Sequence, residues 1–324
     1  MRESYQAESV QEQFVSNDEK IITETPLAPA QSRIGVILAL LAVYLVWGST
    51  YLGMRVALEG FPPFLLAGIR FLLAGSMLYL FLRVRGAPTP SRAQWAGAAL
   101  IGVLLLTIGN GAVVFAVQWV ATGLTAVGIG AVPLWAALFA GIWGRWPTRI
   151  EWLGLGLGFV GVMFLNLGGG LWASPLGAVA LLIGAISWAL GSVWSRHVAL
   201  PSGLMSSATQ MLVGGGVLLL LSLSIREPMP SLHTARPLLA MAFLIFFGSL
   251  IGFCAYGYLL RRVRPALATS YAYVNPMVAV ALGIALNGEH ITIVGLLAML
   301  AIIAGVGLVS LGGDFSRVLR GGRP

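Results

Sequence analysis

The chain alternates long apolar runs with short polar connections. Ten runs have approximate limits of 34–56, 62–82, 94–118, 123–144, 150–168, 175–195, 203–225, 237–260, 266–287 and 291–312. Each is close to the roughly 20 residues that an α-helix needs to cross a bilayer. The connections are too short to hold a water-soluble domain, so any function must reside in the helices. The pattern predicts an all-α polytopic membrane protein with ten transmembrane helices.

Composition supports this fold class. Hydrophobic residues make up 58% of the chain and charged residues only 9%, whereas a soluble domain carries about 25% charge. Long apolar runs are typical of helices rather than of a membrane barrel. A single cysteine, Cys254, excludes a disulfide framework and a cysteine-rich metal site.

The two ends of the chain have a different character. Residues 1–33 hold six of the eleven acidic residues and few apolar ones, which is typical of a disordered tail. Residues 313–324 are polar and basic. We expect both segments to be cytoplasmic tails.

Arginine placement predicts the orientation. With a cytoplasmic N-terminus, fifteen of the nineteen Lys and Arg residues fall on the cytoplasmic side and three on the other. Cytoplasmic loops carry an excess of these residues, so both termini are expected to be cytoplasmic. The same distribution explains the net charge of +8 without a nucleic-acid partner.

The second half of the chain repeats the first. Spacings of 141 to 144 residues relate Trp47 to Trp188, Arg55 to Arg196, Gly75 to Gly216, Pro133 to Pro276 and Gly161 to Gly305. This predicts two five-helix repeats, 34–168 and 175–312. Because five is odd, the second repeat enters the membrane from the opposite side, which gives an inverted repeat around a central site.

Polar and aromatic residues interrupt the apolar runs at related places in the two repeats. Tyr44, Trp47 and Tyr51 fall on one helical face, and a similar stretch returns around Trp188. We expect these stretches to face each other across an aromatic chamber. The predicted substrate-binding residues are Tyr44, Trp47, Ser49, Tyr51, Asn110, Ser187, Trp188, Ser192, Tyr256, Tyr271, Tyr273 and Asn275.

Four residues are candidate hinges or gates. Pro276 should kink its helix beside Asn275, and Pro133 is its counterpart in the first repeat. Arg70 is the only charge deep in a run, so we expect it to pair with a protein group, with a substrate carboxylate as the alternative. Glu289 lies at a helix end, where a gate or structural contact is favoured.

The motifs resemble a known family. The stretches Val46–Tyr51, Gly109–Gly111, Ile186–Val193 and Pro265–Pro276 are similar to the EamA-type branch of the drug/metabolite transporter (DMT) superfamily, over roughly residues 34–312. The resemblance implies export of small metabolites, amino acids or drug-like compounds across the bacterial inner membrane. One departure is that Glu289 has no counterpart in the first repeat, which reads Gly144-Arg145 there.

Other functions fit the sequence less well. An intramembrane enzyme would need a nucleophile and a base at membrane depth, but the three histidines all lie at helix ends. No metal or cofactor is expected. A pore or facilitator channel would need rings of charges or carbonyls and is kept as the alternative to a carrier. Because acidic residues avoid the middle of every run, proton coupling and downhill transport both remain open.

The expected partners are the lipid bilayer and a small-molecule substrate, with the protein a monomer or a weak homodimer. Gly154, Gly158 and Gly161 share one helical face, which is typical of close helix packing. We expect this contact to be intramolecular, with a dimer contact as the alternative.

Overall fold

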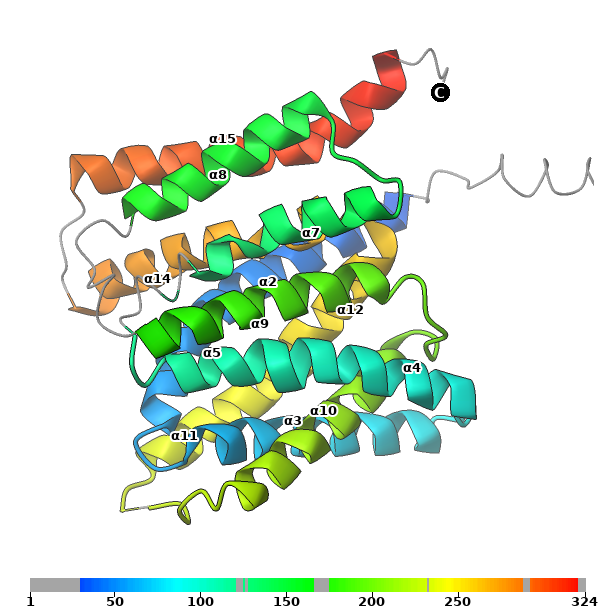
Figure 1. Ribbon diagram of the computed structural model, residues 1–324, viewed down its shortest axis with the longest axis vertical. Helices are drawn as coiled ribbons and strands as arrows, with labels where there is room; N and C mark the ends of the chain where they lie inside the picture. Colours follow the sequence, from blue (N-terminus) through cyan, green and yellow to red (C-terminus); the bar gives the residue numbers. More distant parts are fainter. Residues whose placement is uncertain are drawn as a thin grey trace, which may run out of the picture. The chain divides into compact units, whose positions relative to one another are not determined.

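The computed structural model describes residues 30–120, 125, 128–165, 175–231, 233–287 and 292–319. All regular secondary structure in these residues is helical. Contacts divide the chain into Met1–Ile37 and Leu38–Pro324. The helices from Leu38 onward belong to the second unit, and Figure 1 shows how they are arranged.

In its described residues, each predicted apolar run contains one helix or consecutive helical segments. These are α2 (Ala30–Ala57), α3 (Pro63–Val84), α4 (Arg92–Gly102), η1 (Val103–Asn110), α5 (Gly111–Ala116), α7 (Val132–Ile142), α8 (Arg149–Leu165), α9 (Pro175–Trp194), α10 (Leu204–Ser224), α11 (Arg236–Phe243), η2 (Leu244–Phe253), α12 (Cys254–Arg262), α13 (Pro265–Ala268), α14 (Tyr271–Asn287) and α15 (Ile293–Leu319).

By length and composition, seven helical segments among the described residues can cross a membrane. They contain α2, α3, α4–η1–α5, α9, α10, α11–η2–α12 and α15. Large apolar side chains on these segments are exposed, such as Leu80, Leu220 and Leu239, as expected of surfaces that face lipid. The predicted all-α polytopic class is confirmed, while the count of ten spans stays a prediction.

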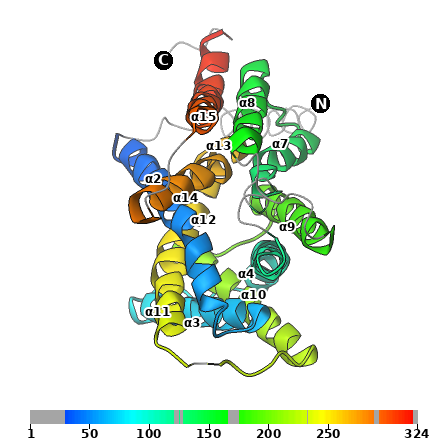
Figure 2. The ribbon, with the colours of Figure 1, turned by 90° about the vertical axis from the view of Figure 1, so that its left-hand side faces the viewer.

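Helices at corresponding positions of the two repeats pack side by side. The pair α3 and α10 lies at one end of the bundle, and the pair α8 and α15 lies at the other (Figures 1 and 2). In the second pair, a Cβ on Gly154 would lie 2.7 Å from the carbonyl oxygen of Gly305, and one on Gly305 equally close to that of Gly154. This close approach confirms that the glycine face of α8 makes an intramolecular contact.

Two π-helical segments interrupt long helices at related positions. They are η1 and η2, which begin at Val103 and Leu244, 141 residues apart. Two of their carbonyl oxygens accept bonds from side chains: Leu104 from Ser187 at 2.8 Å, and Gly248 from Trp47 at 3.0 Å. The apolar pattern predicts uninterrupted helices here, so these segments are a new feature, and π-segments are frequent at functional sites.

The single helix predicted for 266–287 is broken between α13 and α14. Thr269 and Ser270 lie at the break, and their hydroxyls donate to the carbonyls of Pro265 and Leu267 in the preceding turn. Such local bonds compete with a continuous helix. Pro276 lies inside α14, and Pro133 is the second residue of α7, within the apolar stretch Gly128–Ile142. The hinge role of both prolines stays a prediction.

The ends differ from the predicted limits. Helix α2 already begins at Ala30, inside the segment expected to be a tail. Helix α15 continues to Leu319, past the expected limit at 312. Residues 1–29, 320–324 and Glu289 lie outside the described residues.

Candidate functional site

A central cavity lies among residues of α2, α3, η1, α5, α7, α9, η2 and α14. Its described lining consists of Trp47, Thr50, Tyr51, Met54, Arg70, Phe71, Leu106, Gly109, Asn110, Val113, Ile129, Val132, Gly184, Ala185, Trp188, Gly248, Phe253, Tyr271 and Asn275. The lining is mostly apolar and aromatic with a few polar groups, which is typical of sites for small organic ligands.

Seven of the predicted site residues line this cavity together. They are Trp47, Tyr51, Arg70, Asn110, Trp188, Tyr271 and Asn275. Sequence reasoning missed Thr50, Phe71 and Phe253. For Thr50 a signal was present, since it follows Trp47 at helical spacing beside Tyr51, whereas two phenylalanines in apolar runs carry no such signal.

Four aromatic rings form a cluster beside the cavity, and we refer to it as the aromatic cluster. Trp47 lies at its centre, with ring centroids 5.5 Å from Trp188, 5.1 Å from Tyr256 and 4.7 Å from Tyr271. Tyr256 lies 5.5 Å from both Trp188 and Tyr271. The edge-to-face contacts of Trp47 with Trp188 and Tyr271 are favourable ring geometries.

Hydrogen bonds fix the cluster. The indole N–H of Trp188 donates to the Tyr256 hydroxyl at 3.1 Å, and this hydroxyl is 2.6 Å from the Ser192 hydroxyl. Ser192 also lies 2.6 Å from the carbonyl oxygen of Trp188, to which it can donate. The Trp47 indole donates instead to the Gly248 carbonyl in η2. Each buried polar group of the two indoles therefore has a partner, as the apolar surroundings require.

A second cavity lies on the far side of Tyr256. Tyr256 and Phe253 line it together with Val198 and Arg261. Phe253 also lines the central cavity, and the three rings that touch Tyr256 do so as well. The aromatic cluster and Phe253 thus separate the two cavities.

Arg196 lies in the connection that follows α9, next to Ser195 and close to this second cavity. Its guanidinium donates to the carbonyl of Val263, just beyond α12. Burial and, as a smaller effect, the positive charge of Arg145 lower the pKa of Arg196 to about 10. The side chain therefore stays protonated at neutral pH and ties the connection after α9 to the end of α12 within the second repeat.

Arg70 is buried in the middle of α3, with 4% of its surface exposed. Its Nε donates to the Ser249 hydroxyl at 2.7 Å, and its Cζ lies 4.8 Å from the centroid of the Phe71 ring. The expectation that Arg70 pairs with a protein group is met by Ser249, which is neutral.

Asn275 connects α14 to α2. Its amide faces the backbone carbonyls of Tyr44 at 3.2 Å and Tyr271 at 3.1 Å, which assigns the nitrogen, as the donor, to this side of the amide. The Tyr51 hydroxyl bonds to the Asn275 side chain, and the Tyr44 hydroxyl lies 2.7 Å from that of Ser270. Asn275 therefore lines the cavity while it holds two helices together.

Other predicted site residues lie outside the central lining. Tyr273 packs against α8 and donates to the Leu155 carbonyl at 3.0 Å. Ser49 donates to a carbonyl of its own helix, and Ser187 to Leu104 in η1. The surroundings of Tyr273 and Ser187 correspond to helix packing rather than to contact with a ligand.

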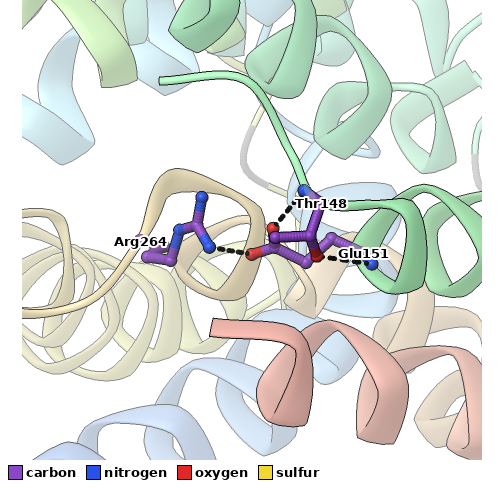
Figure 3. A network of polar contacts seen from close by, with 3 residues as sticks. All are labelled: Thr148, Glu151 and Arg264. Atoms are coloured by element: carbon purple, nitrogen blue, oxygen red, sulfur yellow. Dashed lines mark hydrogen bonds and ion pairs between the residues drawn. The ribbon is translucent and has the colours of Figure 1, made fainter. Parts of the chain in front are cut away.

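A buried carboxylate lies at the start of α8 (Figure 3). Glu151 accepts from the backbone N–H of Thr148 at 2.7 Å, and the Thr148 hydroxyl accepts from the N–H of Glu151. The other Glu151 oxygen is 2.7 Å from Nη1 of Arg264, at the start of α13. This ion pair connects the two repeats away from the central cavity.

Comparisons with known proteins agree with this architecture. A model of the EamA-like transporter family matches residues 33–167 and 175–311. The chain is 46% identical over 275 residues to the uncharacterized inner membrane transporter YedA of Escherichia coli K12, covering 85% of this chain and 90% of YedA. It is 24% identical to the uncharacterized transporter YoaV of Bacillus subtilis, covering 84% and 95%. A solved crystal structure superposes with a TM-score of 0.72 at 21% identity, covering 85% and 96%.

Proposed function

The chain belongs to the EamA-like transporter family, and we propose that it is a secondary transporter that exports small metabolites, amino acids or drug-like compounds by alternating access. One observation carries the proposal: a single central cavity is lined by α2, α3 and η1 of the first family match and by α9, η2 and α14 of the second. Such a site between repeats is where secondary transporters bind their solutes.

The proposed topology is ten transmembrane helices in two inverted five-helix repeats with both termini cytoplasmic. It is supported by the arginine distribution and by the pairing of α3 with α10 and of α8 with α15. The shorter apolar segments Gly128–Ile142, α8 and α14 complete the ten. A 17-residue helix is at the short end of the range that can span.

The aromatic cluster is the proposed cytoplasmic gate. The second cavity lies beyond it, near Arg196 and Arg261, which the positive-inside rule places on the cytoplasmic side. In this conformation the rings close the path from the central cavity to that side. Export would require the cluster to separate and a matching contact at the other end to form.

Solute flux in proteoliposomes tests the proposal. A panel of labelled amino acids, cationic drugs and small organic acids is screened for saturable uptake that is accelerated by unlabelled solute on the opposite side. We expect such exchange for the wild type and its loss in Trp47→Ala and Asn275→Ala. Trp119→Ala is the control, because its side chain is exposed at a helix end. Non-saturating conductance would favour a pore, and wild-type flux in both site variants would remove these residues from the site.

A further inference from the structure

The central cavity holds a cation, Arg70, that forms no ion pair with any residue in the described part of the chain. Arg70 is the only charged residue in the described lining. The ion pairs of the described residues join Arg236 to Glu59 and Arg264 to Glu151, and neither includes Arg70. A buried guanidinium without a counter-charge is costly in a membrane, so an arginine at this place calls for an anionic partner.

The contacts of Arg70 leave one end of the guanidinium for a ligand. Its Nε is occupied by Ser249, whereas Nη1 and Nη2 have no hydrogen-bond partner among the described residues. These two nitrogens carry four N–H groups in a rigid plane, a shape that matches the two oxygens of a carboxylate. The Phe71 ring on one side and the bond to Ser249 fix the plane, which reduces the entropy lost on binding.

A glycine in η2, Gly248, leaves room for the Arg70 guanidinium. A Cβ on Gly248 would lie 2.8 Å from Nη2 of Arg70. The same residue accepts the indole N–H of Trp47 through its carbonyl. Gly248 therefore positions both the charged and the aromatic part of the lining.

We infer that the transported solute is an organic carboxylate with an apolar or aromatic body, held by Nη1 and Nη2 of Arg70 while its body lies against Trp47, Trp188 and Tyr271. This inference rests on the proposed transport function for its physiological meaning. Its chemistry follows from the cavity alone: one unneutralised cation, aromatic walls and no described acidic residue in the lining.

Binding to the purified protein in detergent tests the inference without any transport step. The probes are 3-phenylpropionate, its neutral amide and 3-phenylpropylamine, which share one body and differ in charge. Titration calorimetry should show at least about tenfold tighter binding of the carboxylate than of the amide, as expected for a charge-assisted bidentate contact. Equal affinities, a preference for the amine, or no binding of the carboxylate would overturn the inference.

Variants distinguish an effect of the Arg70 charge on binding from an effect on folding. Arg70→Gln should remove the preference, so that the carboxylate binds no more tightly than the amide. Ser249→Ala keeps the charge but frees Nε, and should weaken carboxylate binding by a smaller factor; it serves as the second test if Arg70→Gln does not fold. Ser310→Ala, an exposed hydroxyl bonded within α15, is the control. Undiminished carboxylate preference in both Arg70→Gln and Ser249→Ala would overturn the inference.

The outcome is distinguishable from that of the proposed function. Carboxylate binding through Arg70 without solute flux in proteoliposomes would contradict the transporter proposal and leave the carboxylate as the ligand of the central cavity. Saturable flux of amines and neutral solutes, with no preference for carboxylates, would support the transporter proposal and contradict this inference.

Discussion

Tyr256 shows how much a single hydroxyl does at the proposed gate. It accepts from the Trp188 indole and pairs with Ser192, while its ring touches Trp47 and Tyr271. Tyr256→Phe keeps these ring contacts but leaves a buried indole N–H without an acceptor, at a cost of about 1–3 kcal/mol. Because this cost falls on the closed gate, the variant should open more often toward the cytoplasm.

The measurement uses the lone cysteine of the chain. Cys254→Ser removes it, and Val113→Cys places a thiol in the lining of the central cavity. Labelling by an impermeant maleimide from the cytoplasmic side should be about fivefold to a hundredfold faster with Tyr256→Phe. Tyr79→Phe is the matched control, since that ring packs on Trp95, outside both cavities. An unchanged labelling rate would show that this hydroxyl does not stabilise the closed gate.

The sequence identified two kinds of site residue: those that recur in both repeats, and polar residues inside apolar runs. Trp47 and Trp188 stood out because each recurs 141 residues from the other, and Arg70 because charge is rare in a run. Tyr273 carried the same signal as Tyr271 but faces α8. Two residues apart on a helix point in directions that differ by about 200°, so one of the pair was bound to lie away from the cavity.

At the scale of elements, η2 packs closely on α2 because Gly252 of η2 leaves space for the Trp47 indole of α2. A Cβ on Gly252 would lie 2.3 Å from the indole nitrogen of Trp47, and the surrounding rings leave the indole nowhere to move. We expect Gly252→Ala to lower the free energy of unfolding by about 1–3 kcal/mol and to impair flux.

A matched glycine provides the control for this variant. Around Gly307 in α15 a Cβ would meet nothing within 4 Å, so Gly307→Ala should be neutral or stabilising by up to about 1 kcal/mol. Thermal unfolding in detergent measures both variants. A Gly252→Ala protein as stable as Gly307→Ala would contradict the close packing of η2 on Trp47.

The ion pair between α8 and α13 predicts an asymmetric response. The Glu151 side chain is 1% exposed, whereas that of Arg264 is 41% exposed. Arg264→Met leaves a buried carboxylate without its counter-charge, a defect of about 3–5 kcal/mol. Glu151→Gln leaves a cation that water can still reach and should cost clearly less.

Melting temperatures of the two variants, and of the double variant, test this order. The double variant should be more stable than Arg264→Met alone, because it no longer buries an unpaired charge. If Glu151→Gln were the more damaging single change, the capping bonds to Thr148 would outweigh the ion pair.

Element boundaries mark where the sequence pattern stops being informative. The apolar runs predicted where helices lie, because burial in lipid requires about the same length of apolar residues everywhere. They did not predict η1 and η2, since a π-turn changes the hydrogen bonds of the backbone and not the hydrophobicity of the run. The break before α14 was signalled by Thr269 and Ser270, which can bond to the preceding turn, but such residues also occur inside continuous helices.

For the whole molecule, the same contact recurs with the roles of the repeats exchanged. A first-repeat tryptophan, Trp47, packs on Gly252 of the second repeat, and a second-repeat tryptophan, Trp188, packs on Gly109 of the first. Their polar partners differ: Trp47 bonds to a carbonyl in η2, whereas Trp188 bonds to Tyr256. Two equivalent halves in unequal states are what a transporter with alternating access must contain at any moment.

The difference between the two halves predicts that the two cavities are accessible from opposite faces of the membrane. In the Cys254→Ser background, Val113→Cys lines the central cavity and Val198→Cys lines the second cavity. If the aromatic cluster is closed on the cytoplasmic side, an impermeant reagent should reach Val198→Cys from the cytoplasm and Val113→Cys from the opposite face. Labelling of both thiols from both faces would indicate a pore, and labelling of both from one face alone would contradict the separation of the cavities. Since the two positions belong to different repeats, the sided result would also require the repeats to span the membrane in opposite senses around one site.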